Sequence, residues 1–327
     1  MPKFLVLRFS SIGDIVLTSP VLRCLRNLVP GAEIHFVCKE AFRPVLENNP
    51  NIDRLFSFRE DSSEILKELR MNRYDAVIDL HHNLRSLGIK RRMNTRSFSF
   101  PKLNVEKWLM VNFKINHLPN VHLVDRYMET LVPLGVKNDG KGLDYFTSPE
   151  DEKILQRIPE SSRENYIGFV IGAKHITKKM PLEKIIALVR NIRGPVILLG
   201  GSEDKQAGDQ ISLAAGSHVF NACGLSGINE SAVLVKHARK IITHDTGLMH
   251  IAAAYQKEIA VIWGNTIPGF GMYPYYGERE SNKSHSFEVN NLRCRPCSKI
   301  GFAKCPRGHF HCMNLQNIQS IADWANA

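Results

Sequence analysis

A short polar segment, Ser10-Ser11-Ile12-Gly13-Asp14, follows the first apolar run of the chain, Lys3 to Arg8. The apolar run predicts a buried strand, and a carboxylate on the loop at its carboxyl end is well placed to act as a general base. The hydroxyls of Ser10 and Ser11 and the backbone N–H of Gly13 are suited to binding an anion. The alternative is that Asp14 only caps a helix or forms an ion pair.

The segment Asp245-Thr246-Gly247-Leu248-Met249-His250 joins a predicted strand, residues 240–244, to an alanine-rich run. We expect a helix here, capped by Asp245 or Thr246, whose first turn presents free N–H groups and the positive end of its dipole. Such an end binds a diphosphate. Gly247 lets a ligand approach the backbone, and His250 lies one turn inside the helix, on the face nearest the turn. The alternative is an ordinary strand–turn–helix unit without a ligand.

Lys178 belongs to a basic loop, residues 172–181, that follows a predicted strand at 166–171. Pro181 suits the first position of the next helix. A lysine in this loop can neutralise the negative charge that builds up on a departing diphosphate. The alternative is a loop whose cations are only solvated.

A basic cluster follows the predicted strand 75–80, which is where open α/β sheets bind their ligands. Its members are Arg85, Lys90, Arg91, Arg92 and Arg96. The cluster indicates either contact with the phosphates of an acceptor or a solvated helix face.

Four cysteines near the end of the chain have the spacing of metal ligands: Cys294, Cys297, Cys305 and Cys312. Four thiolates with one Cys-x-x-Cys pair can hold a structural zinc ion, although the loops are shorter than in a two-pair zinc ribbon. The alternative is reduced buried thiols or adventitious disulfides. We assign no catalytic role to this cluster.

The elements that position these residues alternate between strands and helices in both halves of the chain. Strands are predicted at 3–8, 34–38, 54–58 and 75–80, and again at 166–171, 196–199, 219–223, 240–244 and 259–263. Helices are predicted at 122–134, 182–192, 203–215, 228–238 and 318–324, and another begins either at Gly13 or after Pro20. This alternation predicts an α/β protein with one parallel sheet in each half, covered on both faces.

The composition indicates a globular protein of two domains, with 327 residues of which 43% are hydrophobic. Because the chain has no run of 18 apolar residues and no leader-like start, we expect a cytoplasmic protein, in which seven cysteines do not imply disulfides. The net charge of +11 permits nucleic acid, an anionic membrane surface or phosphorylated small molecules as partners. A nucleic-acid-binding protein is disfavoured, since the cations are scattered and no such motif is present.

Four motifs resemble those of glycosyltransferase family 9, the bacterial ADP-heptose:lipopolysaccharide heptosyltransferases, and they occur in the same order. They are Phe9 to Val16, Lys178 to Pro181, Gly224 to Ser226 and Asp245 to His250. The chain departs from the family pattern in two places. Met180 replaces the usual Trp, and Gly264-Asn265-Thr266 replaces Gly-Pro-Thr.

The resemblance implies a GT-B fold, with two Rossmann-like domains and the active site in the cleft between them. An acceptor-binding domain would span residues 1–149, and a nucleotide-sugar-binding domain would span residues 150–312. The last helix, within residues 313–327, would pack back on the first domain.

The resemblance also implies an inverting transfer of heptose from ADP-heptose to the lipopolysaccharide inner core, with Asp14 as the base. Lys178 and the helix end at Thr246, Gly247 and Leu248 would hold the departing ADP, and Asp245 and His250 would orient the diphosphate-sugar. Ser226 would lie beside the base and ribose. No metal would be needed for catalysis, and the enzyme would contact the inner membrane peripherally. The alternative enzyme is the same fold with another nucleotide sugar or glycan acceptor.

Overall fold

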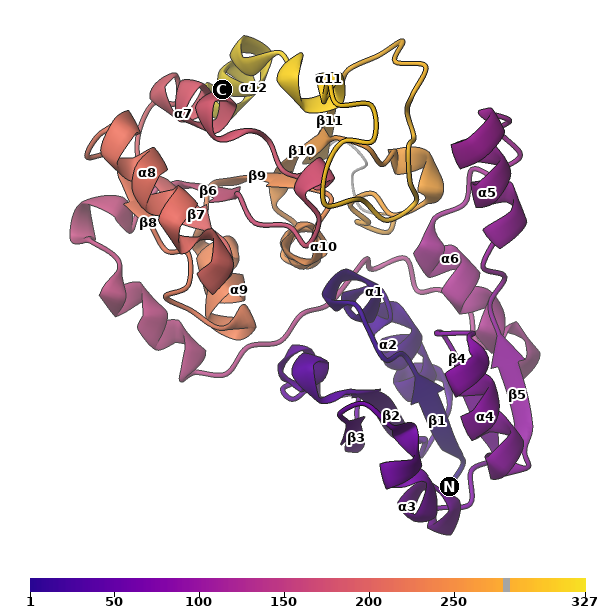
Figure 1. The fold of residues 1–327 in the computed structure, drawn as a ribbon. Helices are drawn as coiled ribbons and strands as arrows, with labels where there is room; N and C mark the ends of the chain where they lie inside the picture. The colour runs from indigo at the N-terminus through magenta and orange to yellow at the C-terminus, as the bar shows by residue number, and fades with distance from the viewer. Residues whose placement is uncertain (279–282) are drawn as a thin grey trace. The chain divides into compact units, whose positions relative to one another are not determined.

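The computed structural model of the chain describes residues 1–278 and 283–327. These residues divide into two compact units (Figure 1). Unit 1 holds Met1–Lys102 and Val121–Phe146, and unit 2 holds Leu103–Asn120, Thr147–Tyr276 and residues 283–327. The chain therefore passes into unit 2 near the predicted boundary at 149. An earlier excursion, Leu103–Asn120, also belongs to unit 2, and Gly277 and Glu278 belong to unit 1.

Unit 1 is built on a five-stranded parallel sheet in the order β3-β2-β1-β4-β5. The strands are β1 (Lys3–Leu7), β2 (Glu33–Lys39), β3 (Arg54–Phe58), β4 (Ala76–Asp79) and β5 (Arg96–Ser99). The chain runs from β1 outward through β2 to β3 and then returns to β4 on the other side of β1. The strand order thus reverses between β1 and β4, which pair with Leu7 opposite Asp79.

The helices of unit 1 are α1 (Ile12–Val16), α2 (Ser19–Leu28), α3 (Leu66–Met71), α4 (Leu84–Met93) and α6 (Leu123–Met128). The chain forms a helix near each of the two predicted starts, since α1 begins at Ile12 and α2 begins at Ser19, before Pro20. After α6 a 3₁₀ turn continues to Leu134 and ends at Gly135, whose φ of +74° suits glycine. This confirms the predicted stop.

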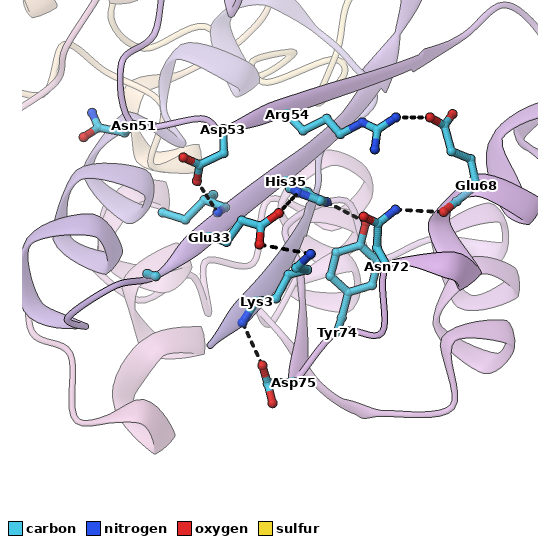
Figure 2. Close-up of polar contacts among 12 residues, drawn as sticks. Lys3, Glu33, His35, Asn51, Asp53, Arg54, Glu68, Asn72, Tyr74 and Asp75 are labelled. Carbon is cyan, nitrogen blue, oxygen red and sulfur yellow. Dashed lines mark hydrogen bonds and ion pairs between the residues drawn. The ribbon is translucent and has the colours of Figure 1, made fainter. Parts of the chain in front are cut away.

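A network of polar side chains joins the strands of unit 1 near their amino ends (Figure 2). The buried ring of His35 contacts the Tyr74 hydroxyl at 2.9 Å and the Glu33 carboxylate at 2.8 Å, and Lys3 pairs with Glu33 at 3.0 Å. Burial lowers the pKa of His35. Because ligands of such sheets bind at the carboxyl ends, we assign this network a structural role.

Unit 2 is built on a six-stranded parallel sheet in the order β11-β10-β9-β6-β7-β8. The strands are β6 (Ile167–Val170), β7 (Val196–Leu199), β8 (Val219–Asn221), β9 (Lys240–His244), β10 (Glu258–Trp263) and β11 (Ser284–Glu288). The order reverses between β6 and β9, so this sheet also has a switch point. Within each unit the strands are fully parallel, as predicted.

Helices cover both faces of the second sheet (Figure 1). They are α7 (Leu182–Arg190), α8 (Lys205–Ala215), α9 (Ile228–His237), α10 (Gly247–Ala254), α11 (His311–Asn314) and α12 (Ile318–Asn326). The helix α5 (Asn104–Phe113), from the earlier excursion, has no buried residue and does not cover the sheet. We predicted that the last helix packs on the first domain. The structure differs: Ile321, Ala322 and Ala325 of α12 join the core of unit 2, beside α7 and β10. Their spacing gives α12 one apolar face, and unit 2 supplies the surface that buries it.

None of the helices in the described part of the chain is long and apolar enough to cross a membrane.

Candidate active site

Asp14 lies in the first turn of α1, at the carboxyl end of β1, and not on a loop as predicted. One carboxylate oxygen, Oδ2, accepts hydrogen bonds from the backbone N–H of Ser11 at 3.2 Å and from its hydroxyl at 2.8 Å. Gly13 is buried inside the same turn, and Ser10 lies just before it. The predicted acid and its small neighbours therefore form one compact group.

The other oxygen of Asp14, Oδ1, pairs with the guanidinium of Arg8 at 2.6 Å. Arg8 is 7% exposed, and it also donates to the backbone oxygens of Ser10 at 2.8 Å and Leu80 at 2.6 Å. Burial acts to lower the pKa of Arg8, but the Asp14 charge raises it above its ordinary value. Arg8 thus joins the ends of β1 and β4 and holds the carboxylate at the switch point.

The turn after β4 is shaped by Asp79, which is fully buried. Its carboxylate accepts from the N–H groups of His81 at 3.0 Å and His82 at 2.7 Å, and from Ser86 Oγ at 2.8 Å. The ring of His81 packs on Phe9 with 4.5 Å between ring centroids. Burial and the neighbouring Arg8 lower the pKa of His81 to about 4, so its ring is neutral near pH 7.

The Nδ1 atom of His81 is buried and makes no hydrogen bond within the described residues. A buried polar atom without a partner is costly, and here it lies beside the Asp14 group. His81 is therefore a candidate ligand contact, and it directly follows the predicted strand 75–80.

The predicted basic cluster is divided by the structure. Lys90 is not solvated, since its ammonium group lies 2.9 Å from buried Asp79 and 2.7 Å from the Ser99 hydroxyl. Arg85 lies over the ring of Phe58, and Arg91 and Arg96 are exposed. Lys90 therefore stabilises the turn after β4, and the exposed arginines are the members available to an anionic partner.

At the switch point of unit 2, Lys178 and Asp245 form an ion pair of 2.7 Å. Lys178 follows β6 and Asp245 follows β9, so the two neighbouring strands deliver them to the same edge of the sheet. The Thr266 hydroxyl donates to Asp245 Oδ2 at 2.9 Å, which fixes the carboxylate from the β10 side. Two residues predicted from separate motifs thus meet.

The helix α10 begins at Gly247, with Thr246 as its N-cap residue. The Thr246 hydroxyl makes no capping hydrogen bond and instead lies 3.2 Å from the hydroxyl of Thr243. Residues 245–248 are partly exposed, whereas the His250 side chain is buried at 1% exposure. The first turn can therefore bind an anion through N–H groups that no N-cap side chain occupies, with Gly247 and Leu248 at its surface.

The loop that carries Lys178 is fixed by His244, the last residue of β9. His244 Nε2 accepts the backbone N–H of Met180 at 3.1 Å, and burial lowers the pKa of His244 to about 4. A neutral ring is required for Nε2 to accept. We predicted that Pro181 is the first residue of the helix α7. In the structure it is instead the N-cap residue, and the helix begins at Leu182.

Ser226 lies in the turn between β8 and α9, at the same edge of the second sheet. Its hydroxyl is 2.8 Å from that of Ser231. Gly224 in this turn has a φ of +71°, and a side chain there would meet the backbone of Ser202.

The segment that contains the cysteines contacts the turn after β10, whose Thr266 holds Asp245 of the ion pair. Arg295 donates to the backbone oxygen of Thr266 at 2.9 Å and pairs with Glu288 at 2.8 Å, and the N–H of Cys297 donates to the backbone oxygen of Asn265 at 3.2 Å. The Asn265 side chain is buried, and neither of its polar atoms has a hydrogen-bond partner within the described residues. Asn265 occupies the position of the proline in the family pattern, so it is a second candidate ligand contact.

The cysteines predicted to hold zinc follow β11, and the last of them, Cys312, belongs to α11. In the described part of the chain, no three His, Cys, Asp or Glu side chains are grouped so that they could hold an ion. Burial, together with the neighbouring Cys294 thiol, raises the pKa of Cys297 to about 11, and burial raises that of Cys312 to about 12. The zinc ion stays a prediction from ligand spacing.

Comparison with known proteins gives the family of the chain. A sequence model described as glycosyltransferase family 9 (heptosyltransferase) matches residues 63–300. Lipopolysaccharide heptosyltransferase 1 of Campylobacter coli is 28% identical over 290 residues, which cover 81% of this chain and 84% of that protein.

Two solved structures resemble the fold. A family 9 glycosyl transferase from Veillonella parvula has a TM-score of 0.77 and 21% identity, with 98% of this chain and 95% of that one covered. The ADP-heptose lps heptosyltransferase II of Escherichia coli has a TM-score of 0.69 and 20% identity, with 96% and 98% covered. The predicted GT-B fold is confirmed, and since the family match spans most of the sequence, this chain is a member of glycosyltransferase family 9, the heptosyltransferase family.

Proposed function

We propose that this enzyme transfers heptose from ADP-heptose to the inner core of lipopolysaccharide. The proteins that this chain resembles support the proposal. One is a lipopolysaccharide heptosyltransferase, and another is an ADP-heptose lps heptosyltransferase. The observation that carries it is the Asp14 carboxylate, fixed by Arg8 and Ser11 at the carboxyl end of β1. A fixed carboxylate is the group that activation of an acceptor hydroxyl needs.

In the proposed reaction, Asp14 accepts the proton of the acceptor hydroxyl as the hydroxyl oxygen attacks the anomeric carbon of the sugar. The bond from that carbon to the diphosphate oxygen breaks on the opposite face, and ADP leaves with the bonding electrons. The configuration at the carbon inverts. Ser10, Ser11 and Gly13 would bind polar groups of the acceptor, and His81 Nδ1 would take one further hydrogen bond.

The diphosphate would bind to unit 2, at Lys178 and the first turn of α10. The lysine ammonium and the N–H groups of Thr246, Gly247 and Leu248 present positive charge to the leaving group. Asp245 would hold Lys178 in place, buried His250 would act through the position of α10, and Ser226 would lie near the base and ribose. We infer that this arrangement needs no metal or other cofactor for catalysis.

A structural zinc ion on Cys294, Cys297, Cys305 and Cys312 is a separate proposal, supported by the ligand spacing alone. No step of the transfer depends on it. Because Arg295 and Cys297 contact the turn at Asn265 and Thr266, a change in this segment would alter donor binding indirectly.

We further propose that the enzyme works in the cytoplasm, at the inner face of the membrane, because its acceptor is a lipid. Exposed arginines at the α4 end of unit 1, such as Arg91 and Arg96, and the net charge of +11 support contact with anionic groups. Nucleic acid is not a proposed partner. Binding of generic DNA or RNA that falls steeply with salt would argue otherwise.

Mass spectrometry of the products tests the proposal directly. A panel of nucleotide sugars, offered with lipopolysaccharide truncated at the inner core, should give a product heavier by one heptose only with ADP-heptose. Transfer of another sugar in preference would support the alternative, the same fold with a different donor. No transfer from any donor would contradict the proposed function.

A further inference from the structure

The segment Pro101 to Asn120 contains no buried residue, although it is rich in large apolar side chains. It includes the helix α5, in which Trp108 is 55% exposed and Phe113 is 58% exposed. Their rings contact each other edge to face, with 5.2 Å between centroids, so they form one exposed aromatic surface. Val105 and Ile115 are exposed as well. A soluble protein seldom leaves so many large apolar groups together in water without a partner for them.

The cysteine-containing segment, Val289 to Cys312, is strongly basic. It has five Lys and Arg residues and no Asp or Glu: Arg293, Arg295, Lys299, Lys304 and Arg307. Arg295 is paired with Glu288, and no ion pair is present for the other four within the described residues. Ile300 and Phe302, which are exposed, lie among these cations.

Apart from Pro101 and Lys102, both segments belong to unit 2, and two contacts hold them together. Lys114, which follows α5, donates to the backbone oxygen of Pro296 at 2.7 Å, and Lys299 Nζ lies 3.5 Å from Asn104 Oδ1. The basic segment also contacts the loop that carries Lys178, because the N–H of Phe302 donates to the Thr177 hydroxyl at 2.8 Å. We call the two segments together, Pro101 to Asn120 and Val289 to Cys312, the interfacial patch.

We propose that the interfacial patch docks the enzyme on an anionic lipid bilayer. Trp and Phe side chains favour the boundary between headgroups and acyl chains, and neighbouring lysines and arginines are attracted to acidic headgroups. The patch presents both kinds of group at once. A second copy of this chain would bring like charges face to face, which disfavours self-association through the same surface.

This inference deepens the membrane contact of the proposed function and names the residues that make it. It assigns the contact to unit 2, beside the loop of Lys178, in addition to the exposed arginines of unit 1.

Vesicle flotation tests the patch without any sugar transfer. The enzyme should float with vesicles of phosphatidylcholine and phosphatidylglycerol, bind pure phosphatidylcholine much less, and be released by high salt. Trp108 should shift its emission to shorter wavelength on binding and be quenched by brominated acyl chains. Trp263 is buried and serves as the internal reference.

The double variant W108E/F113E should lower the vesicle partition coefficient by at least about tenfold, because it removes the inserted rings and adds negative charge. K299Q/K304Q should weaken binding mainly at low salt. The matched control is L213E on α8, where Leu213 is 88% exposed and lies outside the patch; its binding should be unchanged. Equal losses for L213E and W108E/F113E, or no loss for the latter, would overturn the proposal. So would a wild-type dimer in solution that W108E/F113E converts to a monomer.

Activity on a deacylated, water-soluble acceptor separates this inference from the proposed function. W108E/F113E should retain wild-type turnover on that acceptor and lose it on acceptor embedded in vesicles. If the wild-type enzyme binds vesicles but transfers no heptose to either acceptor, the function fails and the docking surface stands.

Discussion

The guanidinium of Arg8 lies 2.6 Å from the carboxylate of Asp14, and the arginine is almost completely buried. A buried cation needs a partner, and Asp14 supplies it at the edge of the sheet where ligands of such folds bind. Arg8 also donates to two backbone oxygens, so it cannot turn away without losing them. The pair therefore fixes the orientation of Asp14 before any substrate arrives.

Replacing Arg8 should reduce turnover through Asp14. R8M removes the charge and all three contacts, and R8K keeps the charge but cannot donate to Ser10, Leu80 and Asp14 together. We expect kcat to fall in both variants, with the larger fall in R8M, and the dissociation constant for ADP to stay near the wild-type value. Steady-state kinetics with calorimetric ADP binding measure the two effects. Weakened ADP binding in a folded R8K would show that Arg8 acts beyond Asp14.

Replacing Lys178 should weaken the binding of ADP and ADP-sugar. The loss of one charge-assisted contact to a diphosphate is worth about 1.5–3 kcal/mol, or roughly 10- to 100-fold in the dissociation constant. K174M is the matched control, since Lys174 lies in the same loop and has no ion-pair partner among the described residues. Titration calorimetry should show the loss for K178M and not for K174M.

D245N and H250Q should weaken donor binding as well, the first by releasing Lys178 and the second by moving α10. If K178M, D245N and H250Q all bind ADP as tightly as the wild-type enzyme, the diphosphate does not bind at the first turn of α10.

The fold follows closely from the apolar periodicity, and the differences have physical reasons. The strand β7 has the predicted bounds because its continuous apolar run ends at Gly200. The edge strands β5 and β11 were missed, since their sequences, Arg96–Ser99 and Ser284–Glu288, are mostly polar. The helix α5 was missed because its apolar residues do not face a core and so show no periodicity.

The candidate site was predictable where one motif carries a function and less so where side chains from distant segments meet. Lys178 and Asp245 were each identified, but their ion pair depends on the adjacency of β6 and β9. For Arg8, the sequence shows only that a cation directly follows a buried strand, which does not identify its partners. Its three partners come from the fold, as do the buried polar atoms of His81 and Asn265.

Folding stability should fall as the pH is lowered from about 6.5 to about 4, in part through His244. Burial lowers the pKa of His244 from 6.5 to about 4, so below pH 6.5 the unfolded chain binds a proton that the folded chain does not. The free energy of unfolding is therefore complete above pH 6.5 and loses up to about 3 kcal/mol by pH 4 from this group. Urea unfolding across this range should show a shallower dependence for H244Q. Parallel curves for the two proteins would contradict the assignment.

Metal analysis of the purified chain tests the cysteine cluster. The ligand spacing predicts about one zinc ion per chain, with a lower melting temperature after chelation. Replacing Cys305 and Cys312 by serine should abolish the zinc, whereas C38S, at a buried cysteine outside the cluster, should leave the content unchanged. A metal-free protein in which the cysteines titrate as thiols would contradict the site.

The most direct measurement is single-turnover transfer by D14N, compared with its ADP-heptose affinity. If Asp14 is the base, the transfer rate should fall by about 10²- to 10⁴-fold while the dissociation constant of the donor stays near that of the wild-type enzyme. A folded D14N that transfers heptose at the wild-type rate, or that no longer binds the donor, would contradict this account.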